Sequence, residues 1–222
     1  MLPLSIETGL SGFLFLFIII TNISSGFFGY KTFGDVDSNA KLQKINKDPT
    51  KFKISFVLIL VEHLGIISLA VTLFITFSPY NIILGIVWCI FRIGEALIQI
   101  YDKRNYWGLL NLAKQYSDTS GAEKDELIDL GRSILKTKDS TFTFAQILFS
   151  IGTLAYSILF VTYGVVPAII GWFGIVASIL YGFGNGIFRI KPKFKALWNI
   201  GGLLILLFEV VLGGWLLFFS HI

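Results

Sequence analysis

Long apolar stretches, separated by short polar or charged connectors, organise the chain from one end to the other. A membrane-crossing helix needs about 20 mostly apolar residues, and six stretches reach that length. The pattern therefore predicts an all-α polytopic membrane protein, in which residues 1–222 form a single domain of six transmembrane helices. The predicted spans are residues 10–30, 54–77, 82–101, 141–163, 168–188 and 196–219.

Composition supports this class of protein. Hydrophobic residues make up 55% of the chain and charged residues only 14%, whereas a soluble domain carries about 25% charged residues. These values exclude a soluble domain, a disordered chain and a nucleic-acid-binding protein. The single cysteine, Cys89, excludes an internal disulfide framework and any CxxC motif.

The basic residues predict the orientation in the membrane. Seventeen of the 18 lysines and arginines lie in three connectors, residues 31–53, 102–139 and 189–195. Cytoplasmic loops of membrane proteins carry an excess of Lys and Arg. We therefore expect a multi-pass protein of the cell membrane, with these three connectors in the cytoplasm and both termini outside.

The connector at 102–139 has its own helical pattern. Ser120 and Glu123 have the spacing of a capping box, and an apolar face follows at helical spacing. This face predicts a short amphipathic cytoplasmic helix that lies on the membrane or on the ends of the spans. It serves either as a plain connector or as a docking surface. Its apolar residues are Leu127, Leu130, Ile134 and Leu135.

Ionisable side chains within the predicted spans are the candidate functional residues, because each is costly in hydrocarbon. Arg92 and Glu95 are three residues apart, so they lie on one helix face and can pair. The single Arg92 is set against three span glutamates, the others being Glu62 and Glu209. A guanidinium cannot neutralise three carboxylates, so a proton, water or a bound cation must share the site.

The predicted orientation places most polar span residues in the cytoplasmic halves of the spans. This bias predicts a polar pocket that opens to the cytoplasm between spans two, three and six. The alternative is a solid core in which the same side chains form an ionic lock that fixes helix register. The candidate binding cluster comprises Asn22, Glu62, His63, Arg92, Glu95 and Glu209.

The chain lacks the residues that several kinds of membrane-protein chemistry require. No lysine lies in a predicted span, so a retinal Schiff base has no anchor, and His63 is the one histidine within the spans. A haem site with two histidines from one chain is therefore excluded. The chain has no HExxH, GxSxG or Walker sequence. We predict no catalytic residue, no metal site and no cofactor, which disfavours an enzyme.

Short motifs, in their order along the chain, resemble a known family. They include Gly34-Asp35 with Asn39-Ala40, then residues 91–96 (Phe-Arg-Ile-Gly-Glu-Ala), and finally Phe208-Glu209-Val210 with residues 213–217. The resemblance is to a prokaryotic family of small six-helix membrane proteins classified only as a domain of unknown function, the four-thousand-three-hundred-and-eighty-sixth in its naming series. It implies six spans and a membrane location, and it includes Arg92, Glu95 and Glu209 in the family pattern. It implies no activity.

Three hypotheses for function follow. The first is a small-molecule or ion binder or transporter that uses the buried Arg/Glu cluster in a cytoplasm-facing cavity. The second is a structural or accessory subunit of a membrane complex, with the cluster as an ionic lock. The third is a membrane enzyme that acts on lipids, with Glu62 and His63 as acid and base. The expected partners are the lipid bilayer and a small-molecule or lipid ligand; an oligomer or a membrane partner stays open, and nucleic acid is excluded.

Overall fold

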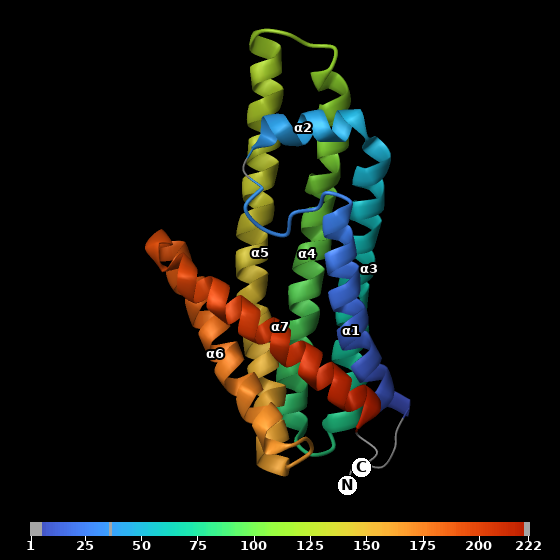
Figure 1. Cartoon of the computed structure of the whole chain (residues 1–222), viewed down its shortest axis with the longest axis vertical. Helices are drawn as coiled ribbons and strands as arrows, with labels where there is room; N and C mark the ends of the chain where they lie inside the picture. Colours follow the sequence, from blue (N-terminus) through green and yellow to red (C-terminus); the bar gives the residue numbers. More distant parts are fainter. Residues whose placement is uncertain (1–5, 36, 220–222) are drawn as a thin grey trace. The chain divides into compact units, whose positions relative to one another are not determined.

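A computed structural model describes residues 6–35 and 37–219, and helices account for nearly all of this part of the chain (Figure 1). Within it there is no β-strand. The elements in chain order are α1 (Ile6–Phe27), α2 (Ser38–Lys47), α3 (Pro49–Phe77), α4 (Ile82–Tyr116), α5 (Ala122–Tyr163), α6 (Ala168–Ile190), the 3₁₀ turn η1 (Pro192–Phe194) and α7 (Lys195–Phe218).

Six of these helices, all except α2, are long and apolar enough to cross a membrane. The prediction of six spans is confirmed, and the chain is a multi-pass membrane protein in a lipid environment. Large apolar side chains stay exposed on the helices, as lipid contact requires. On α6 they recur every three or four residues and form one stripe: Ile169, Trp172, Val176, Ile179 and Phe183.

Local sequence signals explain where several helices begin. The Asp37 carboxylate accepts a hydrogen bond from the Ala40 amide and caps α2. Pro49 is the first residue of α3, where its fixed φ and missing N–H cost nothing. The Asn81 side chain accepts from the Leu84 amide at the start of α4. Gly164, with a φ of 62°, makes the turn between α5 and α6.

The amphipathic helix expected after Ser120 is present, but it is continuous with the fourth span. Helix α5 has 42 residues, about 63 Å at 1.5 Å per residue, twice the hydrocarbon thickness of a bilayer. No proline interrupts the sequence between Ala122 and Tyr163. Leu127 and Leu135 are buried while Leu130 is exposed, so the apolar face packs against protein.

The described packing divides into two compact units, each with its own core. Unit 1 comprises residues 1–19, 64–96 and 145–222, and unit 2 comprises residues 20–63 and 97–144. The single-domain organisation stays a prediction. In unit 1, helices α6 and α7 run side by side (Figure 1), and the core is rich in aromatic side chains, among them Trp88, Tyr156, Phe160 and Phe208.

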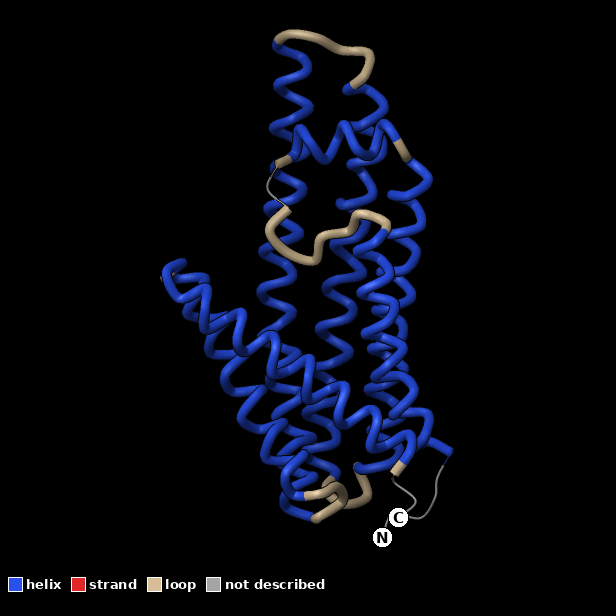
Figure 2. Tube along the Cα trace, in the orientation of Figure 1, coloured by secondary structure: helices blue, strands red, loops and turns tan. Residues whose placement is uncertain are grey.

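Unit 2 contains the short helix α2, which the sequence analysis did not predict. Helix α2 crosses the ends of α4 and α5 that belong to this unit (Figure 1). The Ser38 hydroxyl donates to the Ile128 carbonyl of α5, and the Gln43 amide donates to the Tyr116 hydroxyl of α4. The segment between α1 and α2 is a loop (Figure 2). Leu42, Ile45, Tyr106 and Leu109 are among the residues of the unit 2 core.

Candidate functional site

Three of the six candidate residues meet within unit 1. Arg92 and Glu95 lie on α4, and Glu209 lies on α7. The Arg92 Nη1 atom donates to Glu95 Oε2 at 2.7 Å. The Arg92 Nη2 atom lies 3.9 Å from Glu209 Oε1. The pairing predicted from the three-residue spacing is therefore present, and a second glutamate is within reach of the same guanidinium. We call these residues the Arg92 group.

Close packing fixes the guanidinium in place. Its central carbon lies 4.3 Å from the centroid of the Phe149 ring on α5, a distance at which a cation is attracted to an aromatic face. Gly152, one turn further along α5, leaves room for the Arg92 stem. A Cβ at this glycine would lie only 2.8 Å from Arg92 Cγ. The Arg92 side chain is consequently 3% exposed.

The two carboxylates of the Arg92 group are held differently. Glu95 is 3% exposed and makes the short hydrogen bond. Glu209 is 13% exposed, and 3.9 Å exceeds hydrogen-bonding distance. All other basic residues of the chain lie outside the predicted spans. The group therefore combines one cation with two acids, and the more accessible acid is the more weakly paired one.

The remaining candidates, Asn22, Glu62 and His63, belong to unit 2. The Asn22 side-chain amide on α1 donates to Glu62 Oε1 on α3 at 3.0 Å. His63 is 3% exposed, and neither ring nitrogen has a hydrogen-bond partner in the part of the chain that the structure describes. A buried polar group without a partner is costly. The six residues thus form two groups in two units, and their role as a binding site stays a prediction.

Buried lysines are the feature that the sequence analysis missed. In unit 2, Lys41, Lys103 and Lys138 are 7%, 3% and 1% exposed, although the sequence analysis assigned all three to connectors. Each has an aspartate beside it. Lys41 Nζ lies 2.6 Å from Asp35, Lys138 Nζ lies 3.2 Å from Asp139, and Lys103 Nζ lies 3.9 Å from Asp102.

These pairs fasten the loop between α1 and α2 to the helices around it. Lys138 Nζ donates to the Lys31 carbonyl at 2.6 Å, and Lys41 Nζ donates to the Gly29 carbonyl at 2.9 Å. The Lys103 and Lys138 ammonium groups lie 5.5 Å and 5.6 Å from the centroid of the Tyr30 ring. Each buried ammonium therefore has a carboxylate, a carbonyl or a ring to replace its water.

Two of these three lysine–aspartate pairs can be recognised in the sequence. Asp102-Lys103 and Lys138-Asp139 are adjacent pairs of opposite charge at the ends of predicted spans three and four. Such pairs, next to an apolar stretch and an aromatic residue, are consistent with burial as well as with a solvated loop. The Lys41–Asp35 pair has no comparable signal, because it depends on the path of the loop.

Comparison with family profiles, curated proteins and solved structures gives one result. Residues 10–219 match the profile described as "Domain of unknown function (DUF4386)". No curated protein and no solved structure matches the chain. The matched region contains five of the six helices that can cross a membrane and all of α1 except its first four residues, so the match extends over nearly the whole sequence. The chain therefore belongs to the family described as a domain of unknown function, DUF4386.

Proposed function

We propose that the protein binds a small molecule or ion that carries positive charge, with the Arg92 group as the binding site, and that binding serves transport across the membrane. The observation that carries this proposal is the pairing of Glu209. Its carboxylate lies 3.9 Å from Arg92 and its side chain is 13% exposed, while the short hydrogen bond of Arg92 goes to Glu95.

Charge accounting supports a cationic ligand. A guanidinium with two ionised carboxylates carries a net charge of −1, and an uncompensated charge inside a membrane costs several kcal/mol. A proton or a cationic group at Glu209 removes that cost. An anionic ligand would add to it. The ligand therefore meets Glu209 first, while Arg92 orients both carboxylates.

The second candidate function is a structural or accessory subunit in which the Arg92 group is an ionic lock. The packing of Arg92 between the Phe149 ring and Gly152 favours this alternative, because a side chain buried against both neighbours has little room to move. The two functions differ at Glu209. A lock needs only the fixed Arg92–Glu95 pair, whereas a binder needs Glu209 to exchange its partner.

Orientation is part of the proposal. We infer that the connectors rich in lysine and arginine, residues 31–53, 102–139 and 189–195, lie in the cytoplasm and that both termini lie outside. We also infer a polar pocket that reaches the Arg92 group from the cytoplasmic side. The unequal exposure of Glu95 and Glu209 supports a path to Glu209.

A ligand screen tests the proposal. Purified protein in detergent is heated in the presence of sodium, potassium, tetramethylammonium or spermidine, at pH 6 and at pH 8, and bound species are identified by native mass spectrometry. We expect at least one cation to raise the melting temperature of the wild type but not of Glu209→Gln. Glu126→Gln, on the exposed part of α5, is the matched control and should respond like the wild type. A response that survives in Glu209→Gln would contradict binding at this carboxylate, and the absence of any response in the wild type would favour the ionic lock.

A further inference from the structure

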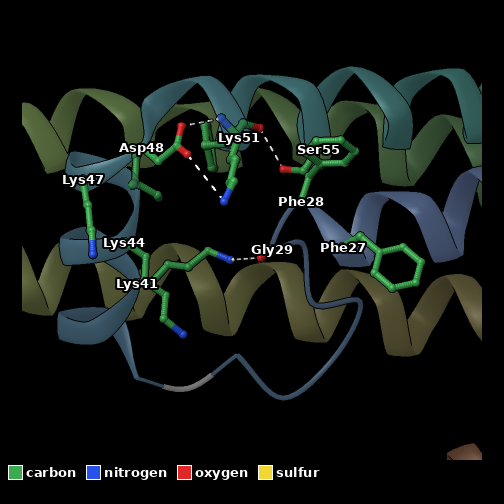
Figure 3. Close-up of a pocket in the computed structure, with 11 residues that line it drawn as sticks. Phe27, Phe28, Gly29, Lys41, Lys44, Lys47, Asp48, Lys51 and Ser55 are labelled. Atoms are coloured by element: carbon green, nitrogen blue, oxygen red, sulfur yellow. Dashed lines mark hydrogen bonds and ion pairs between the residues drawn. The ribbon is translucent and has the colours of Figure 1, made fainter.

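A second site lies in unit 2, on the side of α2 that faces the end of α1 and the start of α3 (Figure 3). A pocket of about 380 Å³ opens there. Four lysines and one aspartate line it, together with aromatic and aliphatic side chains and Ser55. It lies where the apolar stretch of α1 ends at Phe27 and that of α3 begins after Lys53, and the ends of membrane spans are where a chain meets the lipid headgroups.

Two of the four lysines are already neutralised. Lys41 is buried and bound to Asp35 and to the Gly29 carbonyl. Lys51 lies 3.7 Å from Asp48, whose other oxygen accepts the Lys51 amide. Figure 3 shows Lys41 directed at the Gly29 carbonyl and Lys51 directed at Asp48. Their ammonium groups therefore add little net charge to the pocket.

Lys44 and Lys47 supply the surplus charge. Both are exposed, and within the described residues neither has an ion pair. They project from the last turn of α2, one turn apart, so both can reach one ligand. Two lysines without counter-ions match the charge of one phosphate group.

The opposite wall is apolar. Phe27 is 83% exposed at the end of α1, next to Phe28, which also lines the pocket. An exposed phenylalanine at the end of a membrane span is positioned to contact an acyl chain or a glycerol backbone. The pocket therefore presents a cationic edge on α2 and an aromatic edge at the end of α1.

We propose that this pocket binds the phosphate headgroup of an anionic phospholipid. Lys44 and Lys47 pair with the phosphate oxygens, and Phe27 contacts the apolar part of the same molecule. Basic segments beside membrane helices attract anionic lipids. Here the cavity and its apolar wall favour a molecule that combines a phosphate with an apolar part. A zwitterionic headgroup fits less well, because its own cation meets the two lysines. The proposal does not depend on the Arg92 group.

The test is a lipid titration of the purified full-length protein in detergent, followed by native mass spectrometry. The probes are phosphatidylglycerol, phosphatidylcholine and inorganic phosphate. We expect phosphatidylglycerol to bind about tenfold more tightly than phosphatidylcholine, and the double variant Lys44→Gln/Lys47→Gln to lose about tenfold in affinity for it. Phe27→Ser should also weaken it. Equal affinity for the two lipids would overturn the proposal.

Three controls keep the outcome specific. Lys44→Arg/Lys47→Arg keeps both charges and should bind like the wild type. Lys191→Gln/Lys193→Gln removes two exposed charges from another connector and should leave the affinity for phosphatidylglycerol unchanged. If this variant lost as much affinity as Lys44→Gln/Lys47→Gln, the effect would come from the net charge of the protein, and a specific lipid site would be contradicted. Displacement of the bound lipid by inorganic phosphate would overturn the lipid assignment in favour of a soluble phosphate ligand.

Discussion

The ammonium nitrogen of Lys138 lies 2.6 Å from the carbonyl oxygen of Lys31, which precedes it by 107 residues. This hydrogen bond joins α5 to the loop that leads from α1 to α2. Lys138 is 1% exposed and also pairs with Asp139 at 3.2 Å, so its ammonium group has little access to water. The loop path in unit 2 depends on it.

Lys138→Met should therefore destabilise the protein by about 1.5–3 kcal/mol, since it removes a charged hydrogen-bond donor and leaves Asp139 without its counter-ion. Denaturant unfolding in a mild detergent measures the effect. Lys136→Met, two residues earlier and exposed, is the control and should change stability by less than about 0.5 kcal/mol. Equal effects in the two variants would mean that the buried contact adds nothing.

Arg92→Leu should destabilise the protein by about 3–5 kcal/mol, because it leaves Glu95 and Glu209 buried without a cation. Adding Glu95→Gln to this variant removes one of the two orphaned charges and should restore part of the loss. A double variant as unstable as Arg92→Leu would show that the damage comes from lost packing against Phe149 and not from unpaired acid.

Gly152→Ala should disturb the Arg92 group from the opposite helix. The new Cβ would lie 2.8 Å from Arg92 Cγ, so the arginine stem or the helix must shift, at a cost of about 1–3 kcal/mol. Gly186→Ala is the matched control, because a Cβ there meets nothing within 4 Å. If thermal unfolding finds the two alanine variants equally stable, the contact between α4 and α5 is looser than described.

Accessibility of single cysteines tests the topology. In a Cys89→Ser background, cysteines at Lys44, Lys124 and Lys193 should react with a membrane-impermeant maleimide from one side of the membrane. A cysteine at Pro79, in the loop between α3 and α4, should react from the other side. Labelling of the Lys44 and Lys124 positions from opposite sides would contradict the alternation of the six spans.

The sequence predicted the spans well because each depends on a local property, a run of about 20 apolar residues. The Arg92–Glu95 contact was predictable for the same reason, since a spacing of three residues places both on one helix face. Glu209 was predictable as a partner only from the cost of a buried charge. Its 3.9 Å separation from Arg92 depends on how α4 and α7 pack.

Other features depend on tertiary structure and could not be predicted in this way. The charge rule that orients the chain treats every connector lysine as solvated, so it gave no sign that Lys41, Lys103 and Lys138 are buried. Helix α2 is short and mostly polar, and its stability comes from packing on α4 and α5. The part of α5 that extends beyond the fourth predicted span contributes Leu127 and Leu135 to the unit 2 core, a tertiary contact that the local pattern does not show.

Binding of a cation at Glu209 distinguishes a binding protein from an ionic lock, and isothermal titration calorimetry measures it. The cation that gives the largest thermal shift is titrated into the wild type, Glu209→Gln and Glu126→Gln at fixed pH and ionic strength. We expect saturable binding to the wild type and to Glu126→Gln, and at least tenfold weaker binding to Glu209→Gln, a loss of about 1.4 kcal/mol or more. The same affinity in all three proteins, or no binding to the wild type, would contradict the proposed function.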